Sequence, residues 1–169
     1  MRLPQVALVV VLAIAAVQIA YYYPQLPSVM ASHFDISGAP NSWMPKSAFF
    51  GLFCFIYVFY AVLFWLLPHL IMASPASLIN LPNKDYWLSP GRREITAHLI
   101  GDQMAWFGVA LTAFLIAVCQ LAIVANLPGR SGNLGSGIWW LLGLFLAFTL
   151  VWLARFVCSF RLPSGIITR

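Results

Sequence analysis

The sequence has few charged residues, and this scarcity excludes most soluble folds. Only 8% of its 169 residues are charged, whereas 62% are apolar. A soluble domain carries about 25% charged residues, so this chain has too little polar surface to cover itself in water. The nine basic residues are scattered around the ends of apolar runs rather than clustered. Such scattering is typical of a membrane protein and argues against nucleic-acid binding.

Catalytic and redox motifs are also missing. The sequence has no Gly-x-Ser-x-Gly, no His-Glu-x-x-His and no glycine-rich phosphate loop before a helix. Its three cysteines, Cys54, Cys119 and Cys158, fall within or at the end of apolar runs and form no Cys-x-x-Cys pair. We therefore expect no enzymatic activity, no disulfide framework, no metal and no cofactor.

Four apolar runs are long enough to cross a bilayer, which takes about 20 residues per helix. The first run exceeds the about 7–15 apolar residues of a signal peptide, so we expect it to be retained as a span. The expected fold class is an all-α, multi-pass membrane protein. Its predicted spans are residues 4–23, 48–73, 103–125 and 137–158.

The third helix is expected to begin before its span. Ser89 is a candidate N-cap, followed by Pro90 at the first helical position. A helix from there to residue 125 exceeds the bilayer thickness, so about its first ten residues should project out of the membrane. Gly101 is a candidate break between the two parts.

The basic residues also predict an orientation. With a cytoplasmic N-terminus, the loop at residues 24–47 lies outside and the loop at 74–102 inside, and both termini are cytoplasmic. Cytoplasmic segments of membrane proteins are enriched in Lys and Arg. The inner side then holds Arg2, Lys84, Arg92, Arg93, Arg155, Arg161 and Arg169, and the outer side Lys46 and Arg130.

The loop at residues 24–47 carries the most specific pattern. Its prolines bias the preceding residues toward extended conformations, and Gly38-Ala39-Pro40 can then turn the chain. Trp43 can anchor the return. We expect a structured cap that offers a recognition surface rather than a flexible tether. Its candidate partner-binding residues are Tyr23, Pro24, Leu26, Pro27, His33, Asp35, Gly38, Pro40, Trp43 and Lys46.

Two interpretations of His33 and Asp35 stay open. In the first, Asp35 accepts hydrogen bonds from nearby backbone amides and His33 bonds across the loop, so both are structural. In the second, Asp35 orients the imidazole of His33 toward a ligand. A zinc site is disfavoured, because zinc takes about four ligands and the loop offers two.

These spaced residues resemble the first extracytoplasmic loop of the SdpI-like bacterial membrane proteins, which carry domain of unknown function 1648. A second segment, residues 79–90, resembles the cytoplasmic loop that follows the second span in that family. After this segment the family usually has a helix former, and this sequence has Gly91 there. The resemblance covers about residues 10–110. The cytoplasmic motif residues are Asn80, Pro82, Lys84, Asp85 and Trp87.

The resemblance implies a location in the bacterial inner membrane and, loosely, a role in peptide-toxin immunity or signalling. It brings no catalytic residues. The first hypothesis is therefore a non-enzymatic protein that contacts the lipid bilayer and binds a peptide or protein through its outer loop. The alternative is an accessory subunit of a larger respiratory or photosynthetic membrane complex.

Ionisable residues near the inner boundary suggest three further arrangements. Glu94, His98 and Asp102 recur every four residues, which is typical of a solvated helix face and also of a metal site. His69 and His98 form the only histidine pair that suits a haem, the weaker alternative function. Asp102 is expected to form a structural ion pair with Arg155, tying the third span to the fourth.

Overall fold

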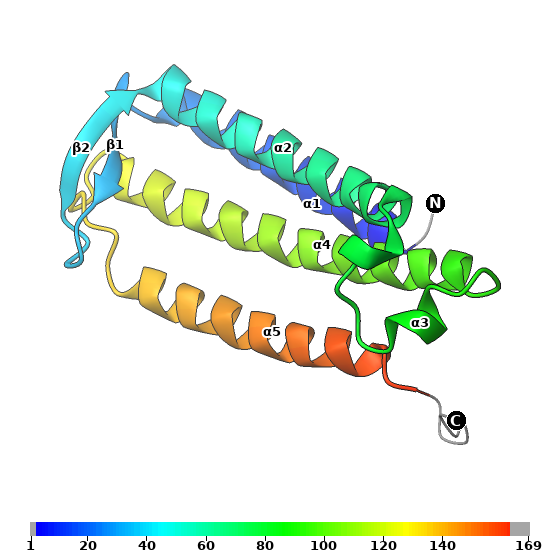
Figure 1. The fold of residues 1–169 in the computed structure, drawn as a ribbon. Coiled ribbons are helices and arrows are strands. Elements are labelled where there is room, and N and C mark those ends of the chain that lie inside the picture. The colour runs from blue at the N-terminus through cyan, green and yellow to red at the C-terminus, as the bar shows by residue number, and fades with distance from the viewer. Residues whose placement is uncertain (1–2, 163–169) are drawn as a thin grey trace.

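The computed structural model describes residues 3–162, in which four long helices lie side by side and a β-hairpin covers one end (Figure 1). All four helices are long and apolar enough to cross a membrane, as predicted. Arg2 and Arg169, which supported the predicted orientation, lie outside the described residues. The long helices are α1 (Leu3–Tyr22), α2 (Lys46–Ala73), α4 (Arg93–Asn126) and α5 (Gly137–Ser159).

Helix α4 is the centre of this arrangement. Helices α1 and α2 both pack against α4 and touch each other little. Gly108 of α4 allows the closest approach, because a Cβ there would lie 2.9 Å from the Phe64 ring of α2. Helix α5 packs mainly on α4 and contributes no buried residue. The helices therefore form a bundle around α4 rather than around a core shared equally by four.

Aromatic rings join α4 to α5. The Phe107 ring lies 4.6 Å from the Trp152 ring and the Phe114 ring 4.4 Å from the Phe145 ring, centroid to centroid. Trp152 Nε1 also donates to the Gln103 carbonyl at 3.2 Å. Aromatic pairs at such separations contribute about 0.5–1.5 kcal/mol each beyond their buried area.

The predicted start of the third helix is wrong. Helix α4 begins at Arg93, and Ser89 does not cap it, because its hydroxyl donates to the Tyr86 carbonyl at 2.9 Å. The amides of Arg92 and Arg93 instead close a turn onto the Ser89 carbonyl. Gly91 lies exposed in this turn, and its low helix propensity agrees with a helix that begins after it rather than at Pro90.

No break occurs at Gly101, and α4 runs on to Asn126. Its 34 residues span about 51 Å at about 1.5 Å per residue, more than the about 30 Å of a bilayer core. Helix α2 likewise continues through Pro68 to Ala73.

The predicted helical, four-span fold is confirmed, and the loop between α1 and α2 is folded as predicted, although it forms a β-hairpin. A 3-10 turn, η1 (Tyr23–Gln25), leads into strand β1 (Val29–Phe34), which pairs antiparallel with β2 (Pro40–Pro45). Ala31 stands opposite Trp43, and register shifts follow at His33. We call residues 23–45 the hairpin cap.

A second cap closes the other end, near both ends of the described chain (Figure 1). It covers residues 74–92, with η2 (Ala76–Leu78) and α3 (Lys84–Trp87), and we call it the loop cap. Arg93 Nη2 donates to the carbonyls of Met72 (2.6 Å) and Ser74 (3.0 Å). These bonds hold the loop cap against the start of α4.

The predicted orientation can be tested by cysteine labelling in a chain without its three native cysteines. With Ser37→Cys at the hairpin tip, an impermeant thiol reagent should label intact cells. With Asn80→Cys in the loop cap, labelling should need permeabilised cells, because the bilayer excludes the reagent. Modification of Ser37→Cys only after lysis would reverse the orientation.

Candidate functional site: the hairpin cap

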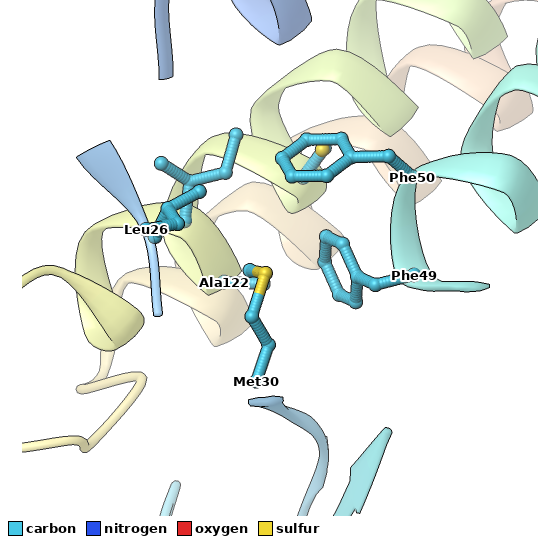
Figure 2. Close-up of a cluster of buried hydrophobic side chains, with 7 residues drawn as sticks. Leu26, Met30, Phe49, Phe50 and Ala122 are labelled. Carbon is cyan, nitrogen blue, oxygen red and sulfur yellow. The ribbon is translucent and has the colours of Figure 1, made fainter. Parts of the chain in front are cut away.

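Apolar side chains seat the hairpin cap on the helix ends. Met30 of β1 is fully buried, and Leu26 is buried beside it. Both belong to one cluster with Phe49 and Phe50 of α2 and Ala122 of α4 (Figure 2). Burying side chains of this size contributes about 1.5–3 kcal/mol each. The cap is therefore a packed part of the fold.

Asn126, the last residue of α4, fixes the outer edge of β1. Its Oδ1 accepts from the Ala31 amide at 2.7 Å, and its Nδ2 donates to the Ala31 carbonyl at 3.0 Å. The same Nδ2 lies 2.9 Å from the Ala122 carbonyl. One amide side chain thus satisfies both main-chain groups that Ala31 turns away from β2.

Lys46, the first residue of α2, ties together the two ends of the cap. Its Nζ donates to the carbonyls of Tyr23 and Leu26, both at 2.9 Å, and lies 4.5 Å from the centre of the Tyr23 ring. Its backbone amide donates to the Ser28 carbonyl at 2.8 Å. Three predicted partner-binding residues therefore contact one another within the cap.

Asp35 shapes the hairpin turn. Its Oδ1 accepts from the Ser37 hydroxyl (2.6 Å), the Ser37 amide (2.8 Å) and the Ala39 amide (3.0 Å). These bonds, first the Ser37 hydroxyl and then the Ala39 amide, hold the pKa of Asp35 below its ordinary 3.8. The geometry favours the structural interpretation of Asp35, since its bonded oxygen serves the turn and not His33.

Gly38 joins the tip to the α4–α5 loop. Its φ of +82° suits glycine, and a Cβ there would lie 2.6 Å from Asn133 Oδ1. The Leu134 amide donates to the Gly38 carbonyl at 2.9 Å. The α4–α5 loop thus holds the tip of the hairpin in place. Strand β2 begins at Pro40, two residues after Gly38.

A few side chains of the hairpin cap are exposed and could contact a partner. Trp43 is 57% exposed and Ile36, at the tip, is 82% exposed. The His33 side chain is also exposed and is hydrogen-bonded to no other group within residues 3–162. Pro24 and Pro27 lie exposed at the entry to the cap. Of the predicted residues, His33 and Trp43 on the strands and Pro24 and Pro27 at the entry are therefore free to meet another molecule.

The residues of the predicted cytoplasmic motif also divide into one that holds the fold together and others that are exposed. Trp87 Nε1 and Asn83 Nδ2 each donate to the Phe160 carbonyl at 2.9 Å, which locks the end of α5. Sequence reasoning missed Asn83, although its position before a short helix and its positive φ of 54° fit this residue type. The other motif residues, Asn80, Pro82, Lys84 and Asp85, are exposed.

The ionisable residues at the same end line a pocket of about 360 Å³ between α1, α2 and α4. His69, His98 and Asp102 all line it. His69 Nδ1 donates to the Trp65 carbonyl (2.9 Å), and the 52% exposed His98 lies 3.8 Å from Glu94. Within residues 3–162, no three His, Cys, Asp or Glu side chains are grouped to hold a metal. The haem alternative stays a prediction.

The predicted Asp102–Arg155 ion pair also stays a prediction. Asp102 lines the pocket toward α1 and α2, whereas Arg155 lies exposed on α5. A contact that does tie α4 to α5 near these residues is the Trp152 bond to the Gln103 carbonyl.

A buried amide network that sequence reasoning missed joins α1 to α4. Gln18, 9% exposed, donates from Nε2 to Gln120 Oε1 (2.8 Å) and to the Ile116 carbonyl (3.1 Å). Gln120 in turn donates to the Tyr22 hydroxyl at 3.1 Å. Polar side chains bond helices together in membranes, so the isolated glutamines within apolar runs were the available signal.

Replacing Asn126 by alanine should loosen the hairpin cap. The Asn126→Ala change leaves the Ala31 amide and carbonyl without partners, which should lower the free energy of unfolding by about 1–3 kcal/mol. The measurement is reversible unfolding in mixed detergent micelles. Asn41→Ala, an exposed residue of the same cap, is the matched control and should change little. Equal effects of the two changes would contradict the role of Asn126.

Acid should open the turn at Asp35. Because its folded pKa is lowered, Asp35 stabilises the turn above its ordinary pKa of 3.8, and this contribution is lost as the pH falls through the folded value. We expect amide exchange at Ser37 and Ala39, measured relative to the intrinsic rate at each pH, to accelerate over that fall. In Asp35→Asn the acceleration should vanish; a pH response that persists there would assign the effect to another group.

Comparison with known families matches the hairpin cap and parts of the helices beside it to one domain model. Residues 9–56 match the family model described as Domain of unknown function (DUF1648). The match takes in most of α1, the whole hairpin cap and the first turns of α2. No curated protein and no solved structure matches the chain. The recognition made from the loop residues is thereby confirmed for this segment: the chain carries a DUF1648 domain over residues 9–56, as SdpI-like proteins do.

Proposed function

We propose that this integral membrane protein is non-enzymatic, lies in the bacterial inner membrane, and recognises a peptide or protein through its hairpin cap on the extracytoplasmic face. Peptide-toxin immunity or signalling is the role we assign to that recognition. One observation carries the proposal. The cap is held rigidly by internal bonds while His33, Ile36 and Trp43 stay exposed.

Rigidity supports a recognition role. Ordering a side chain on binding costs about 0.5–1.5 kcal/mol, and a cap already ordered by Asn126, Lys46 and Gly38 avoids much of the comparable backbone cost. Tryptophan offers a large contact area and is enriched among residues that dominate binding energy. The exposed Trp43 therefore suits the centre of a contact.

The use of the polar residues supports a non-enzymatic role. The ionisable groups of the family-matched loop are Asp35, Lys46 and His33, and the first two are engaged in bonds that shape the cap. A nucleophile or general acid–base needs a partner within hydrogen-bond reach and access to substrate. The hydrogen bonds of Lys46 and Asp35 go instead to main-chain groups and to the Ser37 hydroxyl, so neither side chain is free to act on a substrate.

A second candidate is the accessory subunit of a larger membrane complex. Helix α5 favours this candidate, because none of its residues is buried in this chain. Its exposed side chains include the large apolar residues Trp140, Leu144 and Leu150. Such a face suits either lipid or a neighbouring membrane helix. Migration as a free small protein in mild detergent would exclude this candidate.

The recognition role can be tested by growth. A strain lacking the protein should become more sensitive to a peptide toxin encoded beside it, and the full chain should restore resistance. The His33→Ala/Trp43→Ala variant should fail to restore it, because it removes the exposed side chains of the cap. The matched control is Arg130→Ala/Trp140→Ala, which removes an exposed cation and tryptophan at the same end. Unchanged sensitivity to every neighbouring toxin would contradict the proposal.

A further inference from the structure

The hairpin cap has two strand edges, and they differ. The outer edge of β1 is closed at its middle, because Asn126 bonds both the amide and the carbonyl of Ala31. Residues 41–43 of β2, on the other edge, are all exposed. An exposed edge strand presents unpaired main-chain groups to any chain that can lie beside it.

The register identifies which groups of β2 face outward. In an antiparallel pair, a residue whose main-chain groups point away from its partner strand stands opposite a residue that does the same. Ala31 is such a residue, and Trp43 stands opposite it. The Trp43 amide and carbonyl therefore point out of the open edge, where no described residue outside the hairpin bonds them.

From this edge we infer that β2 is a strand-addition site, at which an extended peptide pairs with the main chain of Trp43. The inference rests on the proposed function and names the conformation of the partner. A peptide residue opposite Trp43 would exchange two hydrogen bonds with it, as in other complexes formed by strand addition.

The composition of β2 fits such a partner. The strand Pro40–Pro45 contains no charged residue, whereas exposed edges are commonly blocked by lysine. Its prolines limit pairing to the centre of the strand, because proline has no amide hydrogen. Met44 packs toward the core, so the alternation of a strand turns Trp43 toward the outside. The contact is then main-chain pairing plus one apolar surface, which selects extended, uncharged segments.

The test uses the full chain in lipid nanodiscs and a phage-displayed library of random 12-residue peptides as the probe. Enriched peptides are then synthesised and measured against three variants. Trp43→Pro removes the outward amide of the open edge together with the indole, so it is compared with Trp43→Ala, which removes the indole and keeps the amide. Val29→Pro is the matched control: Val29 stands opposite Pro45, two residues before Ala31, so its amide points out of the edge of β1.

We expect Trp43→Pro to bind at least about tenfold more weakly than Trp43→Ala, because it loses the hydrogen bond donated by the Trp43 amide and disturbs the bond beside it. Val29→Pro should leave binding within about threefold of the unaltered chain. In the unaltered protein, the peptide should slow amide exchange at Trp43. This second measurement does not depend on the variant folding.

The other outcomes overturn the inference in distinguishable ways. Peptides that bind Trp43→Pro as well as Trp43→Ala, and leave Trp43 exchange unchanged in the unaltered chain, would exclude strand addition while the recognition role stands. No enrichment at all would count against both. A dimer that dissociates in Trp43→Pro without any peptide would assign the edge to a second copy of this chain.

Discussion

Side chains at the helix ends bond main-chain groups that leave the helices, and these bonds organise both ends of the protein. A buried amide or carbonyl without a partner costs about 1–3 kcal/mol, so such bonds matter where the caps pack on the helices. At one end, Asn126 and Lys46 supply the partners. At the other, Arg93 and Asn83 do so. Each is a side chain with several donors, placed at or beside a helix terminus.

The outermost helix depends on these two ends more than on its own packing. Helix α5 buries none of its residues, yet the loop before it bonds the hairpin tip through Leu134 and Gly38. Its last carbonyl, at Phe160, accepts from Asn83 and Trp87 of the loop cap. Aromatic contacts with α4 hold its middle. The caps are thus structural elements of the helix arrangement as well as its surfaces.

The motif residues show why recognition of a family and assignment of a site are different inferences. Spacing in the sequence predicted a structured loop and its DUF1648 pattern, and both were confirmed for residues 9–56. It could not separate residues that build the cap from residues that the cap presents. Asp35 and Gly38 are needed for the turn, whereas His33 and Trp43 are exposed, and neighbouring positions in the sequence gave no sign of this difference.

Amino-acid composition and apolar run length alone determined the four spanning helices, because a bilayer sets their length and excludes charge. Tertiary structure decided the rest. The β-hairpin has no strong alternating pattern, and forms because Ala31 meets an amide 95 residues away in the sequence and Met30 meets a pocket made by α2 and α4. Contacts of that separation depend on how the helices pack, so local sequence could not reveal which edge of the hairpin is closed and which is open.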